Sequence, residues 1–345
     1  MRHSLCMKHD DCLNTIRLLA AINVVWNHSS MHLQLSGIPE WFGKALYFFH
    51  GIPIFFILSG FLVWMSVGRS VSFGSYCKKR FWRIYPELWC AVAVEILVLL
   101  FLYEGSIDWC ELGLFAIGQG TVFPFWVPGC LREYGCGTPN GALWTIFALI
   151  QFYLLAFPAY KLLHGKRIGR WLGCIIGLIL LSIFFSHVHP HIPGNFGKLL
   201  GISFVGTFWM FMFGAFMSEY KDRLLPMLLR WWYVPVVLRV LWLVFSPTDI
   251  PAHCYGLVGP ILTGVAALSL GYRFPFVNVK TDVSYGIYIY HMTIINAMIA
   301  IGLVGGGLIR FGEVVVFSIL FAWISTKSVG SFANNMKNRL SKTGN

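Results

Sequence analysis

The chain has 345 residues, of which 57% are hydrophobic and 17% aromatic, while only 12% are charged. This balance excludes an ordinary soluble domain and is typical of a membrane protein that crosses the bilayer many times. The formal net charge of +12 does not indicate a nucleic-acid partner, because basic residues beside apolar spans more often record membrane orientation.

Ten apolar segments are long enough to cross a hydrocarbon core about 30 Å thick. They lie at about residues 15–33, 44–67, 86–103, 141–162, 171–187, 198–217, 230–246, 253–271, 282–302 and 308–326. We therefore expect an all-α polytopic membrane protein whose single transmembrane domain covers residues 1–345. Residues 1–14 are expected to be cytoplasmic and to contain no removable signal peptide, and residues 327–345 are expected to form a cytoplasmic tail.

The distribution of basic residues predicts the orientation. With both termini in the cytoplasm, 21 of the 26 Lys and Arg residues fall on the cytoplasmic side and four on the opposite side, and Arg239 lies within a helix. This bias agrees with the positive-inside rule, provided that residues 104–140 stay outside. The apolar run at 112–127 is broken by Gly118, Gly120 and Pro124. We therefore expect a re-entrant or interfacial segment there rather than a span.

The nine cysteines show no metal-ligand spacing. Cys110, Cys130 and Cys136 fall in the outer segment, and Cys254 lies near another outer loop. Disulfides among them and free, packed thiols are both compatible with the sequence.

Ionisable residues inside spans are costly, by about 2.5–3.5 kcal/mol each, and are functional candidates for that reason. In the first span, Arg17 and His28 lie on one helix face, roughly 16 Å apart along the axis. Burial would keep the imidazole neutral and able to take a proton from a hydroxyl group. The alternative interpretations are a snorkelling anchor for Arg17 and a packing histidine for His28. The other candidates are Glu95, Arg239, His291 and the Arg310/Glu313 pair.

Four further motifs carry polar or small residues. Arg80 and Arg83 lie three residues apart at the expected cytoplasmic start of a helix, where two guanidinium groups suit a phosphate-bearing ligand. The alternative is that they only anchor the helix, since the positive-inside rule also predicts basic residues there. The second motif is Ser59-Gly60, the third is Trp144 and Gln151, seven apart in the fourth span, and the fourth is the polar stripe of Ser284, Tyr288 and His291 on the ninth span. Close packing between helices is the alternative interpretation of Ser59-Gly60 and of the polar stripe.

Taken in order, these motifs resemble the membrane acyltransferase-3 family, which contains O-acetyltransferases of bacterial surface polysaccharides. The resemblance implies that Arg17 and His28 are catalytic, that Arg80, Arg83, Ser59 and Gly60 hold acetyl-coenzyme A, and that no metal takes part. It also implies substrate or supporting roles for Trp144, Gln151, Tyr288, His291 and Glu95. Family members commonly have an acidic residue where this chain has Leu149, so that role stays unassigned here.

We therefore expect an O-acyltransferase of the bacterial inner membrane that moves acetyl from acetyl-coenzyme A to a sugar hydroxyl of a lipid-linked or exported glycan. A glycan or lipid transporter and an inactive acyltransferase-like regulator are the alternatives. The sequence leaves open which glycan and which acyl group take part and on which side of the membrane transfer occurs. It also leaves open the choice between direct transfer and an acyl-enzyme, and the oligomeric state.

Overall fold

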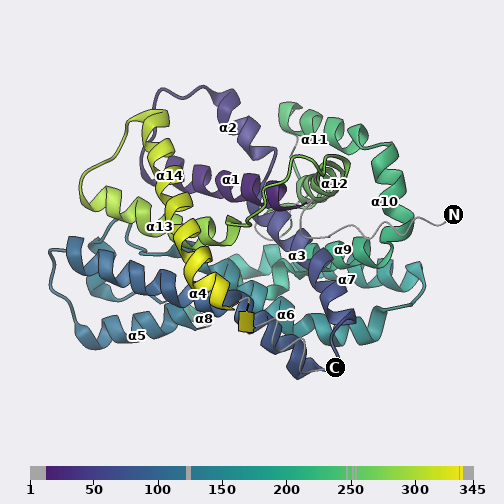
Figure 1. The fold of residues 1–345 in the computed structure, drawn as a ribbon, viewed down its shortest axis with the longest axis horizontal. Helices are drawn as coiled ribbons and strands as arrows, with labels where there is room; N and C mark the ends of the chain where they lie inside the picture. Colours follow the sequence, from purple (N-terminus) through teal and green to yellow (C-terminus); the bar gives the residue numbers. More distant parts are fainter. Residues whose placement is uncertain are drawn as a thin grey trace.

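The computed structural model describes residues 13–121, 126–245, 248–250, 252, 255–333 and 335–336, and within these ranges every regular element is helical (Figure 1). Its longer helices are α1 (Asn14–His32), α2 (Glu40–Tyr47), α3 (Gly51–Gly68), α4 (Phe73–Leu102), α5 (Trp109–Gly120), α6 (Trp144–Leu163), α7 (Ile168–Val188), α8 (Gly194–Gly201), α9 (Phe208–Glu219), α10 (Lys221–Arg230), α11 (Tyr233–Phe245), α12 (Val258–Arg273), α13 (Ser284–Ala300) and α14 (Gly307–Ser325). Short 3₁₀ turns lie at Gly129–Glu133, Gly141–Leu143, His189–His191 and Phe204–Gly206, and a π-turn at Thr326–Gly330 follows α14.

Each of the ten apolar segments contains helix, but fewer of them pass as membrane spans. Within the described ranges, five helical stretches are long and apolar enough to cross a membrane, or six if α10 and α11, bent by 72°, form one broken span. The segment expected at 15–33 forms the 19-residue helix α1, which is not among these stretches. The segments expected at 198–217, 253–271 and 282–302 contain helices of only 8 to 17 residues. Three of these short helices are largely enclosed by protein: α9 buries 9 of its 12 residues, α12 10 of 16 and α13 13 of 17.

Two buried helices, α3 and α13, organise the packing. The neighbours of α3 are α9, α1, α12 and α6, and those of α13 are α14, α1 and α4. Close approach requires glycine in both cases. A Cβ at Gly60 would lie 1.8 Å from the carbonyl oxygen of Phe211 on α9, and a Cβ at Gly286 would lie 2.6 Å from the Cβ of Ala322 on α14.

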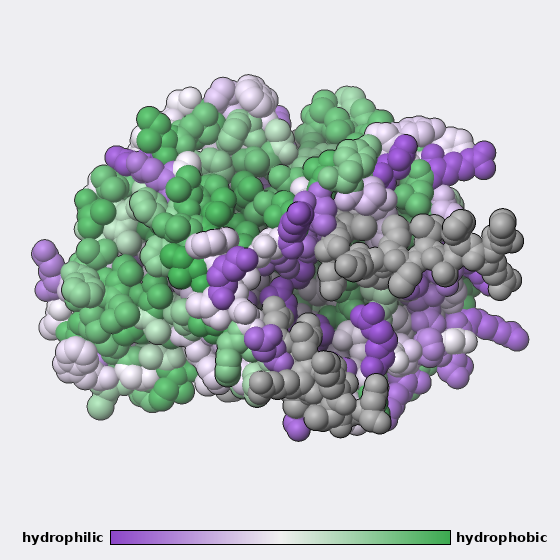
Figure 2. All heavy atoms as spheres, viewed as in Figure 1, coloured by the Kyte–Doolittle hydropathy of each residue, from purple (hydrophilic) through white to green (hydrophobic). Residues whose placement is uncertain are grey.

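The outer surface of the bundle is apolar over much of its area. Figure 2 shows hydrophobic side chains over the left and centre of the view and hydrophilic ones gathered toward the right. On α7, Ile176, Leu180 and Phe184 recur every four residues and are 55%, 60% and 64% exposed. These apolar side chains are not covered by other parts of the protein, so the stripe suits contact with lipid hydrocarbon rather than with water.

The segment that follows α4 folds back onto it. Helix α5 has 12 residues, fewer than the roughly 20 that a span needs, and packs on α4 through Leu112 and Phe115. The re-entrant or interfacial prediction for 112–127 extends into residues 122–125, which lie outside the described residues. Farther along, the Asn296 amide on α13 donates to the carbonyls of Thr138 and Pro139 and accepts from the Cys136 N–H, so this segment is tied to the core.

Cys110, Cys130 and Cys136 are free thiols, whereas Cys254 lies outside the described residues. Of the predicted cytoplasmic ends, residues 1–12, 334 and 337–345 also lie outside the described residues.

Candidate active site

A cavity of about 70 Å³ lies between α1, α3, α4, α6 and α13. Arg17, Arg83 and Ser284 lie together around Asp282. Tyr288 contacts Phe55 and Thr145 in the more apolar part. The half-buried stripe Ile52, Phe55 and Ser59 of α3 forms one wall. The remaining lining residues are Arg17, Phe56, Arg83, Ile84, Thr145, Ile146, Leu149, Tyr153, Ser284, Tyr285 and Tyr288.

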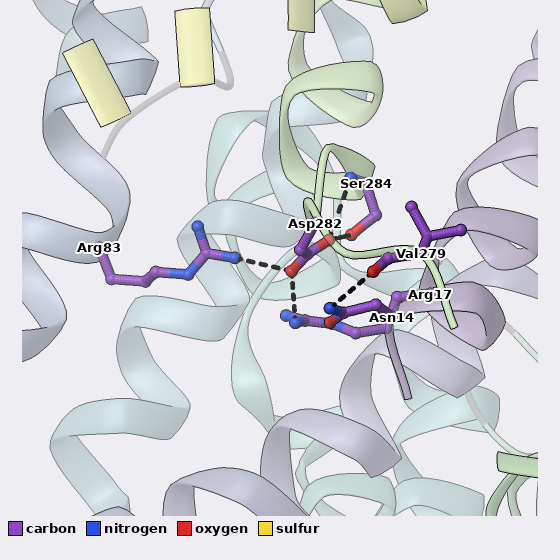
Figure 3. Close-up of polar contacts among 6 residues, drawn as sticks. All are labelled: Asn14, Arg17, Arg83, Val279, Asp282 and Ser284. Carbon is purple, nitrogen blue, oxygen red and sulfur yellow. Dashed lines mark hydrogen bonds and ion pairs between the residues drawn. The ribbon is translucent and has the colours of Figure 1, made fainter. Parts of the chain in front are cut away.

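Asp282, two residues before α13, organises the basic end of the cavity. Its Oδ2 accepts from Arg17 at 2.6 Å and from Arg83 at 3.2 Å, while its Oδ1 accepts from the N–H and hydroxyl of Ser284 at 3.1 and 2.5 Å (Figure 3). The amide of Asn14 donates to the Val279 carbonyl of the same loop at 3.1 Å. Asp282 thus joins α1, α4 and the start of α13.

Charge balance at Asp282 favours the carboxylate. Burial raises the pKa of Asp282, but Arg17, Arg83 and the hydrogen bonds from Ser284 outweigh this and hold the pKa below its ordinary value. Each guanidinium group has five N–H donors, and Asp282 uses one from each arginine. Donors therefore remain at this end of the cavity for an anionic ligand such as a phosphate.

A pair of histidines lies farther along the same two helices. Nδ1 of His28 on α1 is 2.7 Å from Nε2 of His291 on α13, and the two rings stack with centroids 4.9 Å apart. His291 is fully buried and its Nδ1 is 2.7 Å from the carbonyl oxygen of Tyr288. His28 keeps partial exposure and also stacks on His32.

The hydrogen bonds determine which nitrogen carries each proton. A carbonyl oxygen only accepts, so Nδ1 of His291 is the protonated nitrogen and, in the neutral ring, Nε2 is the acceptor. The Nδ1–H of His28 therefore donates to His291. Nε2 of His28 keeps its lone pair, which is the arrangement that a general base requires.

The expectation that Arg17 and His28 share a helix face is met by their contacts. Arg17 binds Asp282 at the start of α13, and His28 binds His291 two turns into the same helix. Helices α1 and α13 therefore run side by side in the same direction. Sequence reasoning missed Asp282, whose signal in the sequence was an acidic residue at the edge of an apolar segment.

The other predicted residues divide between the cavity and the packing around it. Ser59, Arg83 and Tyr288 line the cavity. Arg80 does not: it donates to the Ser66 hydroxyl at 3.0 Å and lies over the ring of Tyr153.

Three further predicted residues sit in helix contacts, and a fourth is enclosed elsewhere. Gly60 faces the backbone of α9, and Trp144 makes an edge contact with Phe56. Gln151 accepts from the Phe204 N–H at 3.2 Å. Glu95 is 2% exposed on α4, beside Asn140. Leu149 lines the cavity, so its position contributes an apolar wall. Among the described residues, no cluster of three or more His, Cys, Asp or Glu side chains could hold a metal ion.

Comparison with known proteins gives consistent results. A family model described as an acyltransferase domain matches residues 10–327. Nodulation protein 10 of Rhizobium leguminosarum bv. viciae is 29% identical over 86% of this chain and 86% of its own length. The O-acetyl transferase of Shigella phage Sf6 is 26% identical over 82% of this chain and 84% of its own length. The peptidoglycan O-acetyltransferase OatA of Listeria monocytogenes is 24% identical over 54% of this chain and 30% of its own length. No solved structure matches.

Proposed function

This chain belongs to the acyltransferase-3 family, whose model covers most of its length, and on that premise we propose that it transfers acetyl from acetyl-coenzyme A to a sugar hydroxyl of a lipid-linked or exported glycan. The names of two relatives support the acyl group and the ester product, since both are O-acetyltransferases. The cavity supports the donor: it joins an arginine cluster at one end to the neighbourhood of a histidine pair at the other.

Arg17 and Arg83 are proposed to bind phosphate groups of coenzyme A. Guanidinium groups bind phosphate oxygens through paired N–H donors, and both arginines line the cavity while held in place by Asp282. The less polar stretch between Ser59 and Phe55 would take the pantetheine arm, so that the thioester points toward the histidine pair. Arg80 is assigned a supporting role, because its side chain turns to Ser66.

His28 is proposed to be the general base. In direct transfer, its Nε2 takes the proton of the acceptor hydroxyl as the oxygen attacks the thioester carbonyl. The new C–O bond forms, the C–S bond breaks, and the departing thiolate of coenzyme A takes up the proton from His28. His291 is a positioning residue in this scheme, since it holds the Nδ1–H of His28. Transient acetylation of His28 itself is the two-step variant of the same chemistry.

The arginine end is proposed to face the cytoplasm of a bacterium, with the protein in the inner membrane, ten spans and both termini inside. The relative directions of the helices support this order. Helices α1 and α13 run in parallel, as the first and ninth spans would. Acetyl-coenzyme A would then enter from the cytoplasm, and the glycan would approach the half-exposed side of His28.

The observation that carries the proposal is the 2.7 Å histidine pair beside a cavity whose other end holds two arginines. The test uses purified protein in lipid nanodiscs with radiolabelled acetyl-coenzyme A and a surface glycan extract, and it measures label in the glycan. We expect His28→Ala to lower transfer by about 10²–10⁴-fold, the usual contribution of a general base. His187→Ala, at an exposed histidine of α7, is the matched control.

Undiminished transfer by His28→Ala would exclude the role assigned to that residue. Movement of glycan across the bilayer without thioester consumption would favour a transporter instead. Failure of the wild-type protein both to bind acetyl-coenzyme A and to move glycan would favour an inactive regulator.

A further inference from the structure

Two aromatic rings line the apolar end of the cavity. Phe55 of α3 and Tyr288 of α13 both line the cavity and meet edge to face with centroids 5.7 Å apart. The ring centroid of His291 is 5.7 Å from that of Tyr288, on the next turn of α13. His291 and His28 do not line the cavity. Tyr288 therefore borders both the cavity and the histidine pair, and we call the contacting rings of Phe55 and Tyr288 the aromatic partition.

The two halves of the aromatic partition are held differently. The Tyr288 hydroxyl donates to the Ala142 carbonyl at 2.8 Å and accepts from the Thr145 hydroxyl at 2.7 Å, and the residue is 4% exposed. Phe55 is half-buried and is held by apolar packing. Tyr288 is thus the fixed half, and Phe55 is the half whose size sets the remaining space.

We propose that Phe55 restricts the donor to thioesters of short, uncharged acyl groups such as acetyl. This inference rests on the proposed function, because it places the acyl end of the donor at the aromatic partition. An acyl chain that extends by several methylenes would overlap the rings of Phe55 and Tyr288, because the cavity is small, about 70 Å³, and Ile52 and Thr145 also line it.

The same surroundings act against a charged acyl group. A succinyl carboxylate at this end would be buried among Ile52, Phe55 and Ile146, and burying a charge without a partner is strongly unfavourable. The arginines that could pair with it lie at the opposite end, where Asp282 holds them. The structure therefore separates charge recognition, at the coenzyme end, from size recognition, at the acyl end.

The test is a competition experiment with purified protein in lipid nanodiscs. Radiolabelled acetyl-coenzyme A is displaced by unlabelled acetyl-, butyryl-, hexanoyl- and succinyl-coenzyme A. For the wild-type protein we expect hexanoyl- and succinyl-coenzyme A each to compete at least about tenfold more weakly than the acetyl compound. For Phe55→Ala we expect hexanoyl-coenzyme A to gain about tenfold or more, because each newly buried methylene contributes about fourfold in affinity. Succinyl-coenzyme A should gain nothing.

Two further variants keep the result interpretable. Phe61→Ala removes a phenyl ring from the same helix, where it is 3% exposed against Tyr272 and outside the cavity lining, and it should keep the wild-type order of thioesters. Phe55→Leu leaves most of the packing and should give an intermediate gain for the hexanoyl compound. Equal competition by all four thioesters in the wild-type protein, or an unchanged order in Phe55→Ala and Phe55→Leu, would overturn this inference while leaving the proposed function in place. Absence of acetyl-coenzyme A binding to the wild-type protein would overturn both.

Discussion

Replacing His291 tests whether the histidine pair sets the tautomer of the base. His291→Leu removes the acceptor that lies 2.7 Å from Nδ1 of His28 and leaves an apolar side chain of similar size in a fully buried position. The Nδ1–H of His28 then has no acceptor there, and the tautomer with a lone pair on Nε2 loses its support. Leaving a buried donor unsatisfied costs about 1–3 kcal/mol, which corresponds to roughly 5- to 150-fold in rate.

We therefore expect His291→Leu to lower kcat for acetyl transfer by about 10- to 100-fold and to change the KM for acetyl-coenzyme A little, because His291 does not line the donor cavity. His291→Gln is the informative partner, since its side-chain carbonyl can accept the Nδ1–H of His28. It should recover a large part of the lost rate. Steady-state kinetics of both variants in nanodiscs, with thermal unfolding measured alongside, provide the comparison.

The tautomer reasoning would be refuted by a Leu variant whose kcat stays within about threefold of the wild-type value, well below the range estimated from the lost hydrogen bond. It would equally be refuted if the Gln and Leu variants, both folded, were impaired to the same extent. A rise in KM without a change in kcat would move His291 from positioning the base to binding the donor.

Three other predictions concern the arginine cluster and the helix packing. The pKa of Asp282 is lowered in the folded protein, so its stabilising contribution is complete above the unfolded pKa of about 3.9 and is lost as the pH falls through the lower folded value. Asp282→Asn should remove that contribution. Thermal unfolding should therefore show a lower Tm for the variant than for wild type at pH 7, and the difference should shrink toward pH 3. Arg83→Ala should raise the KM for acetyl-coenzyme A by about tenfold with kcat retained, whereas Arg80→Ala should have a smaller effect, and equal effects would contradict the placement of only one of them in the cavity. Gly60→Val should prevent stable folding, because even a Cβ would lie 1.8 Å from the Phe211 carbonyl oxygen, and a Tm within a few degrees of wild type would show that α3 and α9 separate easily.

Local chemistry predicted the helices and their faces well. Long apolar runs require helices in a bilayer, since backbone groups cannot be satisfied otherwise, and each of the ten predicted segments contains helix. The eleven-residue step between Arg17 and His28 placed both on one face of α1, and both indeed contact α13 or the residues just before it. The expected ten spans were not confirmed within the described residues, because apolar composition does not distinguish a helix enclosed by protein from one that faces lipid.

Local sequence patterns did not predict the contacts between segments that are distant in the chain. Arg80 and Arg83 had equal standing by spacing, yet the packing of α4 directed one toward Ser66 and the other into the cavity. Glycine at position 60 suited either a ligand or a neighbouring helix, and the position of α9 decided for the helix.

From the sequence alone, the chain was determined to be an all-helical membrane protein with a cation and an imidazole on one face of its first long helix, because hydropathy and the 3.6-residue period are local properties. Tertiary structure alone decided that Asp282 joins Arg17 to Arg83 and that His291 holds the proton on Nδ1 of His28. These partners lie 265, 199 and 263 residues apart in the chain. Periodicity specifies which side chains share a face, but only the packing of whole helices specifies which faces meet.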